Sequence, residues 1–71
     1  MLLVQNTQGD FYEVTIDLAR SHVKSLIMYF ELTPKNEDLE TEYVSVDLQS
    51  RETLPEELER DGYKIITDRN S

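Results

Sequence analysis

The apolar residues of this chain recur with two different spacings, and the change comes near residue 17. In residues 11–16, apolar and polar side chains alternate, which predicts a strand with one buried face. That face carries Tyr12, Val14 and Ile16. Residues 1–5 are mainly apolar and predict a second short strand, and residues 6–10 are typical turn residues. Residues 1–16 are therefore predicted to form a β-hairpin.

From Asp17 to Leu32 the spacing is that of a long helix. One stripe of this helix carries Ala19, Val23, Leu26, Ile27 and Phe30. The carboxylate of Asp17 can accept hydrogen bonds from the free N–H groups of the first turn. Pro34 disfavours helical backbone at the residue before it and so ends the helix. We predict that this helix packs its apolar stripe on a sheet.

The same helix would carry a second stripe, made of Leu18, His22, Ser25, Tyr29 and Leu32. A helix that lies on one sheet needs a single apolar stripe. Either another element of the chain covers the second stripe, or the stripe is a contact surface for a partner or a second copy.

The C-terminal half contains two more predicted strands and a short helix. Residues 33–41 are polar and form a solvated loop, and residues 43–48 alternate as a half-buried strand with Tyr43 on its outer face. Thr53 and Glu56 match a capping box, which begins a helix that ends before Gly62. Residues 63–67 predict the last strand, and we expect Tyr12 and Tyr63 in the core.

These elements predict a single small α+β domain over residues 1–71, in the order strand, strand, helix, strand, helix, strand. The expected architecture is a mixed or mostly antiparallel sheet of three or four strands, with one long and one short helix on one face. The strands at 43–48 and 63–67 could run parallel, because their connection is just long enough.

The chain is strongly acidic and has no cysteine. It carries 15 acidic and 7 basic residues, a net charge of −8, and residues 31–71 hold 12 of the acids. This charge argues against direct binding to nucleic acid or to an anionic membrane, and it suits a basic protein partner. No signal peptide and no membrane-spanning segment is visible in the sequence. We therefore expect a soluble, cytoplasmic protein.

The sequence offers little catalytic chemistry. His22 is the only histidine, and its helical neighbours Leu18 and Leu26 could not orient it as a general base. No phosphate-binding loop, nucleophile motif or zinc motif is present, and the acids at 37–42 lack the spacing of a calcium loop. We predict no enzyme, no catalytic or metal-binding residues and no cofactor.

Two functions follow from these patterns. The first is a protein-interaction module, acting as a regulatory or accessory subunit or as a homodimer. Its predicted interface is Leu18, His22, Tyr29 and Leu32, and an acidic surface would steer the partner. That surface consists of Glu37, Asp38, Glu40 and Glu42. The second is an acidic mimic of nucleic acid that inhibits a DNA- or RNA-binding protein, for which Glu52, Glu56, Glu57, Glu59 and Asp61 would add charge.

Overall fold

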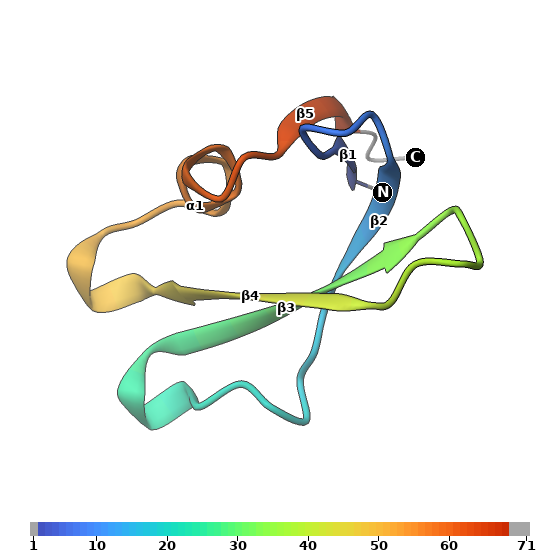
Figure 1. Ribbon diagram of the computed structural model, residues 1–71. Helices are drawn as coiled ribbons and strands as arrows, with labels where there is room; N and C mark the ends of the chain where they lie inside the picture. The colour runs from blue at the N-terminus through green and yellow to red at the C-terminus, as the bar shows by residue number, and fades with distance from the viewer. Residues whose placement is uncertain (1, 69–71) are drawn as a thin grey trace.

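The computed structural model describes residues 2–68, and it describes the side chains of residues 2–66. Five strands and one short α-helix make up most of this part of the chain (Figure 1). The strands are β1 (Leu2–Gln5), β2 (Phe11–Ile16), β3 (Ile27–Pro34), β4 (Glu42–Asp47) and β5 (Lys64–Asp68). The helix is α1 (Leu54–Arg60), and two 3-10 turns are η1 (Val23–Ser25) and η2 (Leu48–Ser50).

All five strands belong to one antiparallel sheet with the order β4-β3-β2-β1-β5. The first four strands follow one another as a meander, because each successive pair is joined by a local connection. The chain then leaves β4, forms α1 and returns to pair β5 with β1. The sheet curls into a half-barrel, and α1 lies over its inner face (Figure 1).

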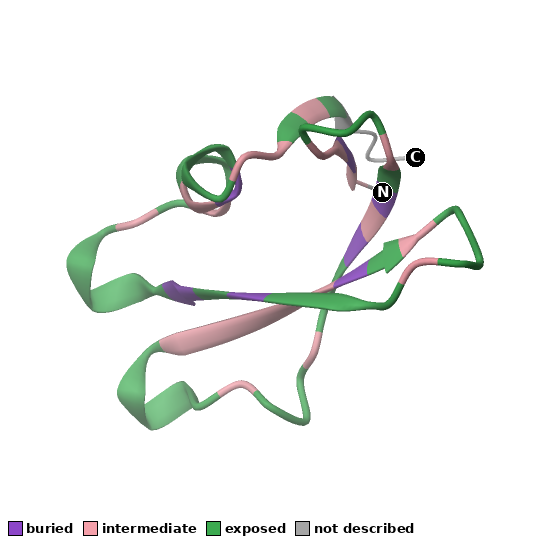
Figure 2. Cartoon of the chain, viewed as in Figure 1, coloured by how far each residue is buried: buried purple, intermediate pink, exposed green. Residues whose placement is uncertain are grey.

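The core lies between the inner face of the sheet and α1. Alternation along each strand selects its members. The buried cluster consists of Val4, Tyr12, Val14, Leu32, Val44 and Leu58, and partly buried residues, among them Phe30 and Leu54, pack around it. Figure 2 shows these buried positions along the strands and on one side of α1. The rings of Tyr12 and Tyr63 meet edge to face, with centroids 5.6 Å apart, as two aromatic residues often do in a core.

The predicted long helix over residues 17–32 is wrong. A single hydrogen-bonded turn follows Asp17, and the segment then forms η1 and the eight-residue strand β3. The Asp17 cap is real but local, because its carboxylate and its carbonyl both accept from the Arg20 N–H, each at 3.3 Å. Aromatic and β-branched residues favour a strand over the second half of this segment. Those residues are Ile27, Tyr29 and Phe30.

The predicted fold class is corrected accordingly. The sheet has five strands instead of three or four, it is antiparallel throughout, and the one α-helix is short. The strands β4 and β5 lie at opposite edges of the sheet, so the parallel pairing considered for residues 43–67 does not occur. Leu48, the last residue of the strand predicted at 43–48, instead begins η2 and is exposed.

Several local predictions are confirmed. The strands β1 and β2 form the expected hairpin, although Met1, placed in the first predicted strand, lies outside the described residues. The Thr53 hydroxyl accepts from the Glu56 N–H at 3.3 Å, so the predicted cap begins α1. Gly62 follows the helix with a φ of +93°, a conformation that favours glycine.

Candidate functional site

The outer face of β3 and β4, away from α1, carries polar and aromatic side chains. In the register of these strands, Tyr29 lies opposite Ser45 and Glu31 lies opposite Tyr43. Alternation turns these side chains away from the core, because the residues between them along each strand pack toward it: Val44 is buried and Phe30 is partly buried. The two strands therefore present three hydroxyl-bearing side chains on this face, with Glu31 beside them.

The connection from β2 to β3 folds back beside this face. The Asp17 N–H donates to the Tyr29 carbonyl at 2.8 Å, which extends the β2–β3 ladder by one bond. The Ser21 hydroxyl donates to the Asp17 carbonyl at 2.9 Å and accepts from the Tyr29 N–H at 3.1 Å. His22 and Ile27 then exchange two backbone hydrogen bonds as an isolated bridge. These bonds fix the backbone on both sides of Arg20 and His22 against β3.

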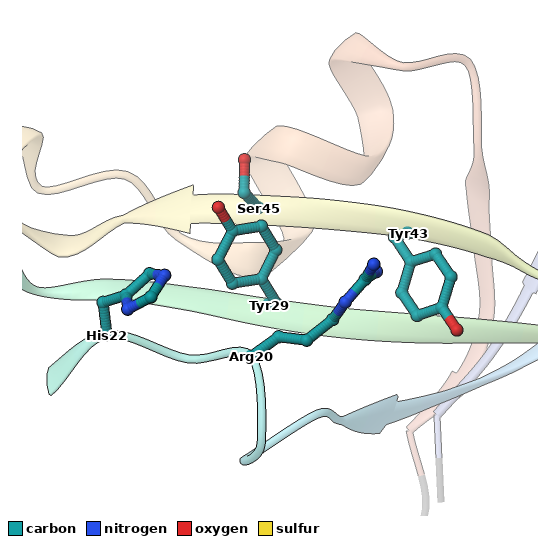
Figure 3. Close-up of a pocket in the computed structure, with 5 residues that line it drawn as sticks. All are labelled: Arg20, His22, Tyr29, Tyr43 and Ser45. Atoms are coloured by element: carbon teal, nitrogen blue, oxygen red, sulfur yellow. The ribbon is translucent and has the colours of Figure 1, made fainter.

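Five side chains close a shallow outer-face pocket of about 350 Å³, lined by Arg20, His22, Tyr29, Tyr43 and Ser45. The guanidinium carbon of Arg20 lies 4.3 Å from the centroid of the Tyr43 ring. The imidazole of His22 meets the Tyr29 ring edge to face, with centroids 6.0 Å apart. Figure 3 shows the Arg20 side chain reaching between the two tyrosine rings, with Ser45 above Tyr29 in this view.

Every polar side chain that lines the outer-face pocket can donate a hydrogen bond, and the hydroxyl groups can also accept one. One guanidinium, one imidazole and three hydroxyl groups line it, and none of the five lining residues is a carboxylic acid. The aromatic rings add flat apolar area beside these polar groups. Such a lining suits a polar or anionic group of a ligand that also offers some apolar surface. Within residues 2–68, no group of three His, Asp or Glu side chains is placed to hold a metal ion.

The predicted interface is only partly brought together. His22 and Tyr29 meet in the outer-face pocket, as described above. Leu18 is 76% exposed, and it is not among the residues that line the pocket. Leu32 is 0% exposed and belongs to the core, so it is not available to a partner. The reason is that Tyr29 and Leu32 are three residues apart, which places them on opposite faces of a strand but near one another on a helix.

Arg20 and Ser45 were missed by the sequence reasoning, and Tyr43 was noted only as an outer-face residue. The signal that could have found the site is the alternation along β3, where Tyr29 and Glu31 share one face. The same alternation along β4 groups Tyr43 with Ser45. Arg20 carries no such signal, because its place depends on how the connection folds.

The four residues of the predicted acidic surface, Glu37, Asp38, Glu40 and Glu42, are all exposed. They lie in the connection between β3 and β4 and at the start of β4, and Leu39 anchors this connection to the core. The side chain of Asn36 accepts from the Asp38 N–H at 3.0 Å and orders the first turn of the connection.

A second group of acids surrounds α1, and Arg60 neutralises part of it. Arg60 donates to Glu52 at 2.9 Å and to Glu57 at 3.0 Å. The hydrogen bond from Arg60 lowers the pKa of Glu52. Desolvation raises the pKa of Glu57, and the nearby charges of Glu52 and Asp61 add to this rise.

Comparisons of this chain with models of protein families, with curated proteins and with solved structures gave no match. Among residues 2–68, no helix combines the length and the apolar character that crossing a bilayer requires.

Proposed function

We propose that this chain is a small protein-interaction module that binds its partner at the outer-face pocket. The observation that carries the proposal is the convergence of Arg20, His22, Tyr29, Tyr43 and Ser45 from three separate segments on one hollow. Tyrosine and arginine are the residues that protein interfaces favour, because they combine contact area with hydrogen-bonding groups. The proposal involves no catalytic step.

The hydrogen-bonded backbone around the site supports a binding role. Tyr29, Tyr43 and Ser45 stand on paired strands, and backbone hydrogen bonds hold the segment that carries Arg20 and His22. A site that is already ordered loses little conformational entropy when a ligand binds. The partner is another protein, and we expect a basic one, because a net charge of −8 attracts positive charge and repels negative charge.

We expect peptides selected from a phage-displayed library to bind at the outer-face pocket. The selected peptides would be titrated into the isotope-labelled chain and followed by NMR. Chemical shifts should move mainly at the five lining residues. A double substitution, Tyr29→Ser with Tyr43→Ser, should abolish binding while the backbone spectrum keeps the dispersion of the sheet.

Ile66→Ser serves as the matched control. Ile66 is 41% exposed on β5 and Tyr43 is 47% exposed on β4, so both substitutions remove exposed apolar area near an edge of the sheet. Binding should survive Ile66→Ser. Shifts that map to another surface, or a double variant that still binds, would contradict the proposal.

The second candidate is the acidic mimic of nucleic acid. The acids around α1 favour it, because Glu52 and Asp61 lie near enough to Glu57 to raise its pKa. Such a mimic would bind a DNA-binding protein through charge, so that binding would weaken steeply with salt. Replacing the exposed Glu56 and Glu59 by Gln would then weaken binding, whereas the two tyrosine substitutions would not.

A further inference from the structure

We propose that the outer-face pocket is a receptor for a single carboxylate, carried by a glutamate or aspartate in an otherwise basic, extended segment of the partner. This inference rests on the proposed function and names the group that the pocket recognises. Three features carry it: the planar end of Arg20, the small number of positive charges, and the acids on either side.

Contacts within the chain position the Arg20 side chain but leave its terminal amino groups available for a ligand. Its ion pair within residues 2–68 joins Nε to the Asp17 carboxylate at 3.9 Å, which is a long contact. The hydrogen bonds among the described residues include none from the Arg20 side chain. Stacking on the Tyr43 ring orients the guanidinium, and its two terminal amino groups stay available. This planar fork matches the two oxygens of a carboxylate.

A carboxylate fits the pocket better than a phosphate group does. Arg20 is the one permanently charged group among the five lining residues, and the chain as a whole carries a net charge of −8. A phosphate monoester brings almost two negative charges at neutral pH, and this acidic protein repels them more strongly than a single charge. The hydroxyl groups of Tyr29, Tyr43 and Ser45 supply neutral donors around the one cation.

Acids flank the pocket on the same face of the sheet. Glu31 lies opposite Tyr43 in the register, and Asp47 lies two residues beyond Ser45 on β4. Residues two apart on a strand are separated by about 7 Å, so the face presents an acid, the donor pocket and a second acid at regular steps. An extended peptide has the same step. The matching ligand is therefore a segment with the pattern base, spacer, acid, spacer, base.

The probe is a synthetic peptide, acetyl-Lys-Thr-Glu-Thr-Lys-amide, compared with the same peptide carrying Gln in place of Glu. The Gln peptide is more positive, so the net charge of the chain alone would make it bind more tightly. A carboxylate receptor reverses that order. We expect the Glu peptide to bind about threefold to tenfold more tightly, the range expected for the net contribution of one typical hydrogen bond. NMR titration would measure both affinities and locate the binding site.

Variants of the chain test whether Arg20 is responsible. Arg20→Gln should abolish the preference for the Glu peptide, and Arg20→Lys should reduce it, because lysine keeps the charge but lacks the planar fork. Tyr29→Phe keeps the ring and removes one hydroxyl donor, so it should also reduce the preference. Lys64→Gln is the matched control. It removes the same charge from an exposed position on β5 and should leave the preference unchanged.

The outcomes distinguish failure of the carboxylate receptor from failure of the proposed function. If both peptides perturb the pocket with equal affinity, or if the Gln peptide binds more tightly, the carboxylate receptor is wrong while the interaction module stands. A preference that survives Arg20→Gln, or one that Lys64→Gln abolishes equally, also overturns the receptor. If neither peptide binds and library selection yields no ligand for the pocket, the proposed function falls as well. In a further outcome, the Gln peptide gains affinity when its C-terminal amide is replaced by a free carboxylate, while the Glu peptide amide shows no gain over the Gln peptide amide. That result would overturn the assignment to a side-chain carboxylate.

Discussion

Successive side chains along β3 point alternately to the core and to the face that carries the outer-face pocket. Leu32 is fully buried, whereas Tyr29 on the other face lines the outer-face pocket. Tyrosine occupies both environments in this chain. Tyr12 and Tyr63 pack against one another on the inner face, and Tyr29 and Tyr43 present their rings outside. The phenol of a packed tyrosine is coupled to folding, because burial disfavours its ionised form.

We expect Tyr63 to destabilise the fold at high pH. Desolvation raises its pKa above the ordinary value of 10.0, and the charges of Glu42, Tyr12 and Asp61 add to this rise. Above pH 10.0 the unfolded chain releases this proton more readily than the folded chain, so the free energy of unfolding falls as pH rises toward the higher folded pKa. Below pH 10.0 this contribution is fully present.

Urea unfolding at about pH 8, 10 and 11 would measure this loss. Tyr63→Phe keeps the ring and lacks the ionising group, so its stability should fall less over the same interval. Equal losses in both proteins would contradict the assignment to Tyr63.

At the scale of elements, α1 is short and depends on its ends and on one buried anchor. Thr53 caps its start, Leu58 is 0% exposed, and Leu54 packs at the margin of the core. A helix of seven residues is not stable by itself in water, so its packing on the sheet must hold it in place. The helix contacts β4 and β5, so the core cluster in turn depends on α1 for its cover.

Leu58→Ala should therefore cost about 2–5 kcal/mol, the range for removing a buried leucine side chain. A domain of this size has only a few kcal/mol of net stability, so we expect the variant to be largely unfolded at room temperature. Circular dichroism and urea unfolding would measure the change. Leu18→Ala removes the same atoms from a residue that is 76% exposed, and it should change stability by less than about 0.5 kcal/mol. Similar losses in the two variants would contradict this role of Leu58.

The elements also show which parts of the fold could be predicted from the sequence. The hairpin of β1 and β2, the strand β4 and the capped helix α1 depend on local signals, namely alternation, turn residues and a cap. The segment 17–32 carries a cap and apolar residues that fit a helix as well as a strand. The pairing of β3 with both β2 and β4 decides between the two, and no local pattern reports this pairing. The two apolar stripes were evidence against a helix, because a strand has two faces whereas a helix that lies on a sheet needs a single apolar stripe.

The candidate site, too, could be predicted only where local signals suffice. His22 and Tyr29 were placed on one stripe of a helix that does not form, because their seven-residue spacing would bring them near one another there. In the structure they meet because the His22–Ile27 bridge returns the chain to β3. Arg20 could not be predicted, because its contact with Tyr43 joins two segments that only the tertiary fold brings together.

At the scale of the whole molecule, the charge is large for the size. A net charge of −8 is carried by a chain with a radius of gyration of 12.1 Å. The described ion pairs of Arg20, Lys35 and Arg60 neutralise only some of the acids. Most of the remaining acids are exposed, and their mutual repulsion opposes the compact state.

A second copy as the partner stays a proposal that light scattering at several concentrations would test.

Added salt should therefore stabilise the fold. Between about 0.02 and 0.3 M sodium chloride the Debye length shortens from roughly 20 Å to about 6 Å, which screens repulsion across the molecule. We expect the thermal midpoint to rise by about 5 °C, the change that roughly 1 kcal/mol produces in a domain of this size. Glu56→Lys with Glu59→Lys halves the net charge and should shrink this effect. A midpoint that falls with salt would mean that the ion pairs outweigh the repulsion.

The position of β5 beside β1 has a consequence for how the sheet is assembled. The hairpins of β1 to β4 join strands that are close in sequence, whereas Val4 pairs with Ile65 near the other end of the described chain. During synthesis β5 is made after the strands β1 to β4. The edge of β1 that pairs with β5 therefore stays unpaired while the meander forms. Long-range pairings are slow, because the loop must close before any contact rewards it. We therefore expect the pairing of β5 with β1, rather than the formation of the hairpins, to limit the folding rate.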